Sequence, residues 1–193
     1  MATQEIRELK KALRKEFKSR RNCLEKSEKS ALDAKIRSRI LNSESFKYAD
    51  TVLMFCPTEK EVDILPIFEK ALSLGKRVAF PRCKKRPDMD FFYVTSLDEL
   101  EINNYGIAEP KDGCEKFEGS LHPFCIVPCL TACADGTRLG YGGGFYDKFL
   151  SGFDGISASV IYSEFLSEKL PIEKRYDKKT DLIITEKEVL IVG

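Results

Sequence analysis

The sequence predicts a single three-layer α/β domain in which helices flank a mixed, largely parallel sheet. Three observations favour this fold class. Strand-like and helix-like segments alternate after residue 50. The 193 residues suffice for one buried core but not comfortably for two, and we find neither an internal repeat nor a low-complexity linker. We therefore expect one domain over residues 1–193, with an N-terminal helical pair, 1–42, packed on the α/β core.

Residues 1–40 predict two amphipathic helices, because apolar side chains recur at spacings of three and four residues. The first stripe consists of Ile6, Leu9, Leu13 and Phe17, and the second, expected after Ser27, of Leu32, Ile36 and Ile40. This region holds thirteen Lys and Arg against six Asp and Glu, whereas the whole chain has a net charge of only +1. Either these cations form the solvated side of the helices, or some of them face an anionic ligand.

Residues 51–81 are typical of a strand–helix–strand unit. The apolar segment 51–56 predicts a strand, Asp63 is expected to cap the helix that follows, and Gly75 to end it. The segment 76–81 predicts the second strand, which a right-handed crossover would place parallel to the first.

The rest of the chain continues this alternation. Further strands are expected at 89–94, 124–128, 156–162, 182–185 and, at an edge, 189–192, and a short helix at 145–150. Cys125, Cys129 and Cys133 recur every fourth residue, which is compatible with a metal site, but without a Cys-x-x-Cys pair we expect buried core thiols. The one histidine, His122, is expected at the surface rather than in catalysis.

Composition argues against several classes of protein. No apolar stretch is long enough to span a membrane, and the charged first residues are unlike a secretory signal peptide. The small net charge gives no support for binding to nucleic acid or to a membrane surface. Seven cysteines without an export signal indicate free thiols in a reducing compartment, so we expect a cytoplasmic protein.

The segment 135–149 carries the strongest indication of chemistry. Four of its positions are glycine: Gly140, Gly142, Gly143 and Gly144. Such a backbone can approach a ligand closely and direct N–H groups at anionic oxygen, beside the N-terminus of the next helix. Arg138 adds a planar cation for phosphate, and Asp147 adds a carboxylate for Mg²⁺. The spacing matches neither a Walker A motif nor a Rossmann fingerprint, and spacing alone leaves phosphate binding and a flexible turn equally open.

Residues 138–147 read Arg-Leu-Gly-Tyr-Gly-Gly-Gly-Phe-Tyr-Asp, which resembles the signature of the 5-formyltetrahydrofolate cyclo-ligases, also called 5,10-methenyltetrahydrofolate synthetases. The resemblance extends over nearly the whole chain. It includes a basic motif at 10–14, a strand-end segment with an acidic substrate contact at 55–63, a Gly-Ile-x-Glu-Pro stretch at 106–110 and Val-Pro at 127–128. Several ordered motifs at matching separations are more specific than one glycine-rich loop.

The resemblance implies an enzyme with a fold like that of sugar-phosphate isomerases and CoA transferases, which uses ATP and Mg²⁺. It implies cyclisation of 5-formyltetrahydrofolate, polyglutamylated or not, to 5,10-methenyltetrahydrofolate with release of ADP and phosphate. In that chemistry ATP phosphorylates the formyl oxygen and N10 attacks the activated carbon, which requires positioning and charge neutralisation more than proton transfer. The resemblance also implies a monomer whose partner is this small molecule, and neither nucleic acid nor a membrane.

Position by position, the resemblance implies three groups of site residues. The nucleotide-binding group is Lys10, Lys11, Arg14, Arg138, Leu139, Gly140, Tyr141, Gly142, Gly143, Gly144, Phe145 and Tyr146, of which Arg138 is also catalytic. The substrate-binding group is Cys56, Glu61, Tyr141, Gly142, Gly143, Gly144 and Phe145. The metal-binding group is Asp147 and Asp181. Phe145 stands where the family often has tyrosine.

Two other classes of function are compatible with an α/β scaffold. A sugar-phosphate isomerase or a CoA transferase would need a base or a carboxylate nucleophile in the glycine-rich segment, where Asp147 is the candidate. A non-catalytic binding module, for example one associated with RNA, would not need the combination of Arg138, the four glycines and Asp147.

Overall fold

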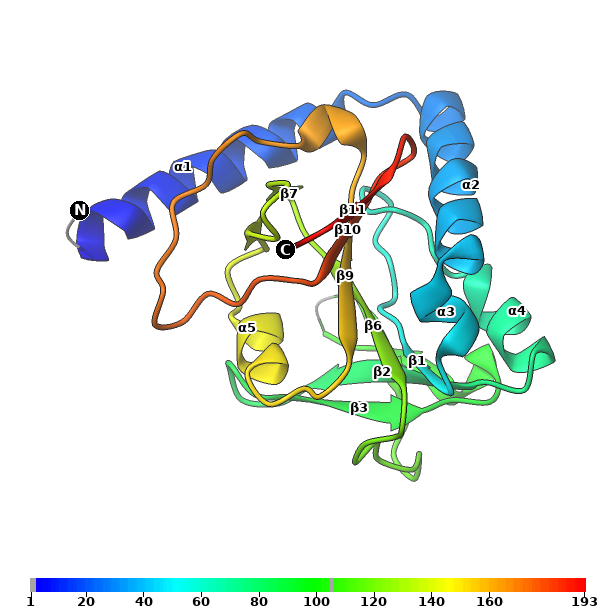
Figure 1. Cartoon of the computed structure of the whole chain (residues 1–193). Coiled ribbons are helices and arrows are strands. Elements are labelled where there is room, and N and C mark those ends of the chain that lie inside the picture. The colour runs from blue at the N-terminus through cyan, green and yellow to red at the C-terminus, as the bar shows by residue number, and fades with distance from the viewer. Residues whose placement is uncertain (1–2, 105) are drawn as a thin grey trace.

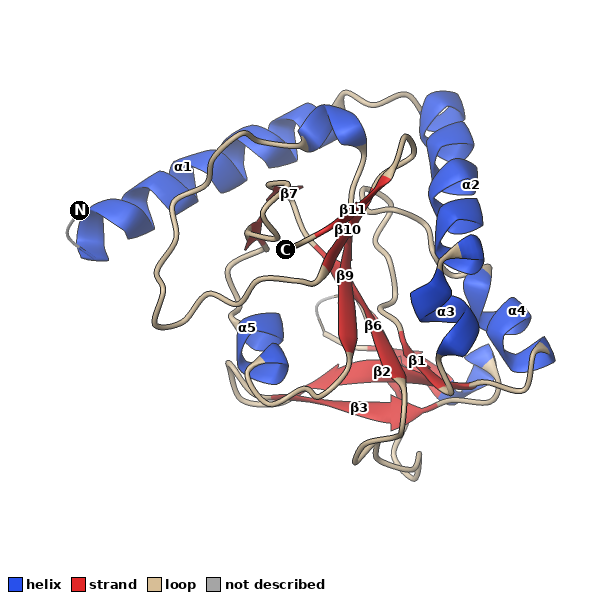
Figure 2. Ribbon diagram, in the orientation of Figure 1, coloured by secondary structure: helices blue, strands red, loops and turns tan. Residues whose placement is uncertain are grey.

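A computed structural model describes residues 3–104 and 106–193 and shows a seven-stranded mixed sheet with helices packed around it (Figures 1 and 2). Across the sheet the order is β11 (Val189–Ile191), β10 (Leu182–Ile184), β9 (Ile156–Val160), β6 (Pro123–Pro128), β1 (Thr51–Leu53), β2 (Arg77–Cys83) and β3 (Met89–Tyr93). The five inner strands are parallel, and the two edge strands, β3 and β11, run antiparallel to their neighbours. The predicted fold class is therefore confirmed.

The helices divide between the two faces of the sheet. They are α1 (Thr3–Asn22), α2 (Lys26–Asn42), α3 (Glu44–Tyr48), α4 (Ile67–Ser73) and α5 (Phe145–Leu150), with short 3₁₀ turns η1 (Leu97–Glu99) and η2 (Ser163–Phe165). Ile36 of α2, Phe46 of α3 and Ile67 of α4 share one buried cluster with sheet residues. Phe149 of α5 packs in a second cluster with Phe91 of β3, on the other face. Figure 1 shows α2, α3 and α4 on one side of the sheet and α5 on the other.

The strand order has a switch point between β1 and β6, where the connections to the next strands run in opposite directions across the sheet. From β1 the chain crosses through α4 to β2, which lies on one side of β1. From β6, on the other side of β1, the chain continues to β9, still farther away. In open α/β sheets ligands bind outside the carboxyl ends of the strands at such a point. The topology therefore favours a site beyond the ends of β1 and β6.

The strand–helix–strand prediction holds, with corrections to its bounds. The strand β1 is shorter than 51–56, because beyond Leu53 only the N–H of Met54 still bonds to β2, at Ala79. The prediction that Asp63 caps the helix was wrong. α4 begins at Ile67 behind Pro66, and Asp63 Oδ1 instead accepts from the Leu65 N–H at 3.1 Å, a local turn. Gly75 ends the helix with a φ of +75°, as predicted.

Several elements were not predicted. They are α3, the strand pair β4 (Leu100–Ile102) and β5 (Ala108–Pro110), and the pair β7 (Thr131–Ala132) and β8 (Arg138–Leu139). Strands of two or three residues are too short to show an alternating apolar pattern. The pair β7–β8 matters for function, because its register places Arg138 opposite Ala132 at the start of the glycine-rich segment.

Candidate functional site

A cavity of about 820 Å³ opens at the carboxyl ends of the parallel strands. Cys56 lies just after β1, Cys83 ends β2 and Pro128 ends β6, and all three line the cavity. Its walls also include one side of α1 and the glycine-rich segment that leads into α5. The site therefore lies where the strand order places it.

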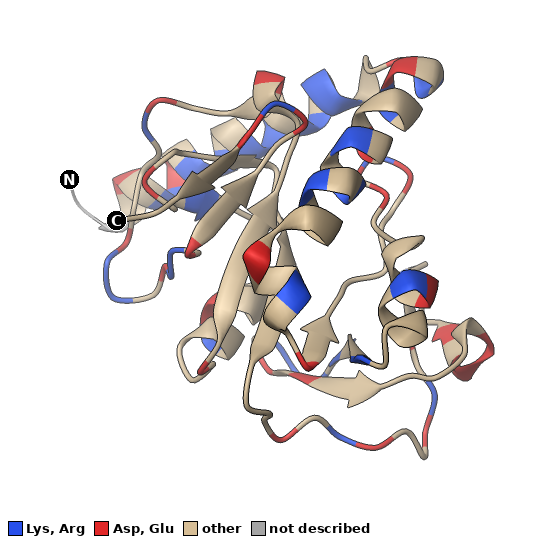
Figure 3. Cartoon of the chain, turned by 45° about the vertical axis from the view of Figure 1, so that its right-hand side comes forward, with Lys and Arg blue, Asp and Glu red and all other residues tan. Residues whose placement is uncertain are grey.

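Basic side chains dominate the walls of this cavity. Among the described residues that line it, eight are Lys or Arg, five are Asp or Glu and none is histidine. Figure 3 shows Lys and Arg recurring along α1 and α2, and three of the cations on α1, namely Arg7, Lys10 and Arg14, line the cavity. Part of the basic N-terminal charge thus faces this cavity, while Lys11 and others are exposed to solvent.

Two arginines from distant segments converge on the glycine-rich segment. The Nε–H of Arg14 donates to the Gly140 carbonyl at 2.9 Å, and the Nε–H of Arg86 donates to the Gly143 carbonyl at 2.8 Å. Desolvation lowers the pKa of Arg14, and the like charge of Arg86 adds to this lowering. Two neighbouring guanidinium groups held on one loop are an arrangement that an anion such as phosphate stabilises.

The backbone of this segment requires glycine at particular positions. Gly142 has a φ of +96° and Gly144, which precedes α5, has a φ of +78°. A Cβ atom at Gly142 would lie 3.1 Å from Cζ of Arg14. Gly142 therefore both turns the chain and leaves room for the arginine.

We expect Gly142→Ala to lower the free energy of unfolding by about 1–3 kcal/mol, because alanine would be held in left-handed backbone. It should also disturb Arg14 and so weaken binding of anionic ligands. Gly140→Ala is the matched control for stability, since its φ is not positive and a Cβ there meets no atom within 4 Å. Denaturant unfolding compares the two variants, and equal stabilities would contradict the strain argument.

Arg138 and Asp147 form an ion pair in the cavity wall. Arg138 Nη1 lies 2.9 Å from Asp147 Oδ1 and donates to the Lys178 carbonyl at 2.8 Å. The Lys178 N–H also donates to Asp147 Oδ1, at 3.0 Å. The Arg138 side chain is only 4% exposed and that of Asp147 is 30% exposed. The guanidinium is thus fixed in position, and among the described residues the bonds to Asp147 all use Oδ1.

A long segment after η2 forms another wall of the cavity. Glu173 pairs with Arg7 at 3.9 Å, and Asp177 pairs with the buried amino group of Lys10. Figure 1 shows this segment running beside α1. Because Lys178 bonds to both members of the Arg138–Asp147 pair, the segment ties α1 to α5 across the site.

The end of the cavity near β1 has a different character. Glu61 is buried, its Oε2 accepts the Thr58 N–H at 2.8 Å, and it lines the cavity together with Tyr141. Desolvation and the nearby Glu61 raise the pKa of Tyr141 above its ordinary value. Burial, together with the charge of Glu109, raises the pKa of Cys56 to about 12. Cys56 is therefore a neutral thiol that can line a binding site and not a thiolate nucleophile.

The structure brings most of the predicted site residues together. Those that line the cavity are Lys10, Arg14, Cys56, Glu61, Asp147 and all residues from Arg138 to Tyr146. Lys11 and Asp181 are not among the described residues that line it. Lys11 is exposed on α1, and Asp181 Oδ2 accepts from the Ser157 N–H and hydroxyl at 2.8 and 2.6 Å. The roles of these two residues stay predictions.

Other cavity residues were missed at the level of sequence. Arg86 belongs to none of the motifs noted in the sequence; it is exposed, but its Nε–H bonds to the glycine-rich segment. Glu109, which accepts the Cys83 N–H at 3.0 Å, lies on the unpredicted strand β5. Only the Gly-Ile-x-Glu-Pro stretch at 106–110 gave a signal for this part of the cavity.

Two predictions about where residues lie, for the three cysteines and for His122, are confirmed. Cys125, Cys129 and Cys133 are buried, and all seven cysteines of the chain are free thiols. His122 is exposed next to the start of β6, where its backbone carbonyl accepts the Asp50 N–H at 3.2 Å.

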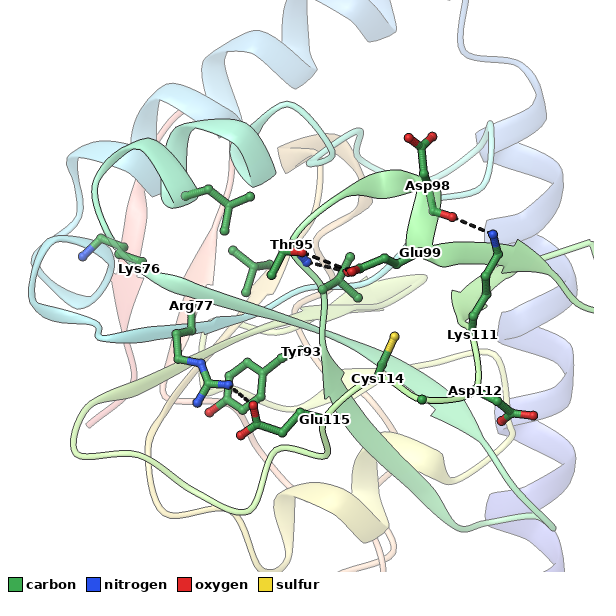
Figure 4. Close-up of a pocket in the computed structure, with 14 residues that line it drawn as sticks. Lys76, Arg77, Tyr93, Thr95, Asp98, Glu99, Lys111, Asp112, Cys114 and Glu115 are labelled. Atoms are coloured by element: carbon green, nitrogen blue, oxygen red, sulfur yellow. Dashed lines mark hydrogen bonds and ion pairs between the residues drawn. The ribbon is translucent and has the colours of Figure 1, made fainter.

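A second cavity, of about 720 Å³, lies near the start of β2 (Figure 4). Its cations are already engaged within the protein. Arg77 stacks on the Tyr93 ring and bonds to Glu115 at 2.6 Å, and Lys111 Nζ donates to the Asp98 carbonyl at 2.7 Å. Because its charged groups neutralise one another, this cavity is the weaker candidate for an anionic ligand.

The fold and the cavity at its topological switch point define the class of protein: an α/β protein with a cation-rich cavity at the carboxyl edge of its sheet. The model of the 5-formyltetrahydrofolate cyclo-ligase family matches residues 6–186. The chain therefore belongs to this family of enzymes, and the resemblance seen in its motifs is confirmed.

Relatives and solved structures agree with this assignment. The 5-formyltetrahydrofolate cyclo-ligase of Escherichia coli (strain K12) is 28% identical over 179 residues, which cover 90% of this chain and 98% of that protein. The cyclo-ligase of Mus musculus is 24% identical, with 96% and 98% covered. The NMR structure of Aquifex aeolicus 5,10-methenyltetrahydrofolate synthetase has a TM-score of 0.84 at 31% identity, covering 95% of this chain and 93% of that one. Within residues 3–104 and 106–193, no helix is both long and apolar enough to cross a membrane.

Proposed function

We propose that the protein catalyses the ATP- and Mg²⁺-dependent cyclisation of 5-formyltetrahydrofolate to 5,10-methenyltetrahydrofolate, with release of ADP and phosphate. Family membership supports the reaction class. The observation that best supports the use of ATP is that Arg14 and Arg86 both bond to the glycine-rich segment, beside the Arg138–Asp147 pair. This is the cation-rich environment that a triphosphate requires.

The proposed reaction has two steps. The γ-phosphoryl group passes from ATP to the formyl oxygen, and ADP leaves. N10 then attacks the formyl carbon, the bond from that carbon to the phosphorylated oxygen breaks, and phosphate departs as N10 loses its proton. Phosphorylation is needed because the oxygen of a formamide is a very poor leaving group. Fixed cations can stabilise the charge that develops on the phosphoryl oxygens in both steps.

The residues of the chain have distinct proposed roles. Arg14 and Arg86, held by carbonyls of the glycine-rich segment, bind phosphate oxygens, with Lys10 nearby in the same wall. Arg138 is oriented by Asp147 and by the Lys178 carbonyl, so its guanidinium needs little reorganisation when negative charge develops on the substrates. Cys56 and Glu61 contact the folate at the other end of the cavity.

Asp147 fits the requirements of a magnesium ligand. Mg²⁺ in such sites is typically held by one or two carboxylates together with phosphate oxygens and water. Asp147 lines the cavity, and the bonds it accepts from Arg138 and Lys178 use Oδ1, which leaves Oδ2 for the ion. Bound Mg²⁺ would neutralise phosphate charge. Asp181 is a second proposed acidic contact, although its Oδ2 is engaged by Ser157.

The ion pair also bears on the isomerase and transferase alternatives. Both would use Asp147 as a base or nucleophile. Asp147 Oδ1 already accepts from Arg138 Nη1 and from the Lys178 N–H, which fixes the carboxylate in the cavity wall. The geometry thus favours a role in orientation or metal binding over one in proton transfer.

The proposed function is tested by mixing the purified protein with 5-formyltetrahydrofolate, ATP and Mg²⁺ and following the near-ultraviolet absorbance of methenyltetrahydrofolate. We expect the band to grow only in the complete mixture, with one ADP formed for each product molecule. Growth without ATP would contradict the proposed chemistry. No growth with folded protein that binds ATP would assign the cavity to another substrate.

Glu61→Gln should raise KM for 5-formyltetrahydrofolate roughly tenfold or more and change KM for ATP little, because a carboxylate can accept two hydrogen bonds from the donor edge of a pterin. The amide keeps the size of the side chain and an oxygen for the Thr58 N–H. Glu118→Gln, an exposed carboxylate outside the described lining of the cavity, is the control. Equal effects on both substrates would refute the role.

A further inference from the structure

Arg21, near the C-terminal end of α1, is a buried cation that has no part in the proposed reaction. It is only 3% exposed, and it is not among the described residues that line the cavity. Its guanidinium lies over the Phe165 ring, 5.5 Å from the centroid, and its described hydrogen bonds all go to backbone carbonyls. Burial of a charged group is unfavourable unless its N–H groups are bonded, so these carbonyls hold the guanidinium in place.

The carbonyls belong to two segments, which follow the strands on either side of the switch point. Nη1 of Arg21 donates to the Lys60 carbonyl at 3.2 Å, in the segment after β1. Nη2 donates to the Cys129 carbonyl and, at 3.3 Å, to the Leu130 carbonyl, in the segment between β6 and β7. Because the guanidinium is planar and rigid, this one side chain fixes the spacing between the two segments.

The segment after β1 carries Glu61 in a tight turn. The Glu61 N–H donates to the Thr58 carbonyl at 3.0 Å, and Glu61 Oε2 accepts the Thr58 N–H at 2.8 Å. These bonds fix the carboxylate relative to the turn but not relative to the rest of the site. Lys60 lies within the turn, directly before Glu61, so its bond to Arg21 restrains the turn as a whole.

The segment after β6 is itself anchored to the strand that carries Arg138. The Leu130 N–H donates to the Leu139 carbonyl at 2.8 Å, one residue beyond Arg138 in β8. Arg21 therefore ties the turn of Glu61 to a part of the site that is already fixed.

We propose that Arg21 is a positioning residue for the folate substrate. It holds the turn that carries Glu61 against the segment after β6, so that the carboxylate is aligned with the donor edge of the pterin. The inference rests on the proposed function and deepens it. Alignment matters because hydrogen bonds weaken steeply when their angles depart from linearity, and a carboxylate that accepts two bonds at once loses both when it is displaced.

The test uses Arg21→Lys, which keeps the positive charge but replaces the planar fork with a single ammonium group. We expect KM for 5-formyltetrahydrofolate to rise roughly three- to tenfold, within the range of coupling between neighbouring residues, and KM for ATP to change little. In the double variant with Glu61→Gln, KM for the folate should be close to that of Glu61→Gln alone, because Arg21 acts through Glu61. A general loss of stability would not produce this dependence.

Arg20→Lys is the matched control. Arg20 precedes Arg21 on α1, lies over the same Phe165 ring and donates to a backbone carbonyl, that of Glu164, at 2.7 Å. None of its described bonds reaches the turn of Glu61, so both KM values should stay as in the wild type. An unchanged KM for the folate in Arg21→Lys, or effects that simply multiply in the double variant, would overturn the inference and leave the proposed function intact.

Arg21→Gln, whose neutral amide can still donate to a carbonyl, repeats the measurement if the lysine variant does not fold. Absence of folded protein for both variants would assign Arg21 to stability alone and would also overturn the inference. A Glu61→Gln variant with unchanged KM would remove the proposed role of Glu61 and the inference with it. A wild-type protein that neither binds nor converts 5-formyltetrahydrofolate would overturn the proposed function as well.

Discussion

Arg138→Ala is expected to lower kcat/KM by roughly a hundred- to a thousandfold, the usual effect of removing one preorganised group that stabilises developing charge. The side chain is almost fully buried, and its Nη1 is fixed by Asp147 and by the Lys178 carbonyl. Its loss would leave the Asp147 carboxylate partly buried without its cation. We therefore also expect the free energy of unfolding to fall by about 1–3 kcal/mol.

The loss of activity can be separated from the loss of stability. Arg37 is not among the described residues that line the cavity. It makes a similar set of bonds, to the carboxylate and the backbone carbonyl of Asp63. Arg37→Ala should therefore reduce stability and keep kcat/KM of the folded protein. If steady-state kinetics of Arg138→Ala, measured well below its unfolding temperature, matched those of Arg37→Ala, Arg138 would have only a structural role.

Asp147→Asn is expected to raise the Mg²⁺ concentration for half-maximal activity roughly ten- to a hundredfold. The amide retains an oxygen that can accept from Arg138 and Lys178, so the local structure should persist, while the negative charge that attracts the cation is lost. Titration of activity with Mg²⁺ at saturating ATP measures the effect.

Asp154→Asn, an exposed carboxylate on the loop after α5, provides the comparison. Its Mg²⁺ dependence should equal that of the wild type. An identical Mg²⁺ dependence in Asp147→Asn would show that Asp147 serves only to orient Arg138.

The sequence predicted those parts of the structure that depend on local patterns. The short helix at 145–150 and the C-terminal end of α4 at Gly75 were predicted from the positions of glycines, which readily adopt positive φ, and from the spacing of apolar residues. The motif-based assignment of Arg14, Glu61 and Asp147 to one site is matched by the cavity that all three line. Such motifs identify site residues even though they contain no information about the contacts that bring these residues together.

What the sequence could not predict depends on contacts between distant segments. Lys10 meets Asp177, which is 167 positions away, and Arg86 meets Gly143, which is 57 positions away. No periodicity links such pairs, and a basic loop residue looks the same whether it is solvated or bonded to a glycine-rich segment.

The fate of the formyl oxygen shows directly whether ATP phosphorylates it. The protein would convert 5-formyltetrahydrofolate labelled with oxygen-18 in the formyl group, in the presence of ATP and Mg²⁺, and the released phosphate would be analysed by mass spectrometry. We expect one labelled oxygen in each phosphate, because that oxygen is phosphorylated and leaves with the phosphoryl group. Methenyltetrahydrofolate formed together with unlabelled phosphate would contradict it.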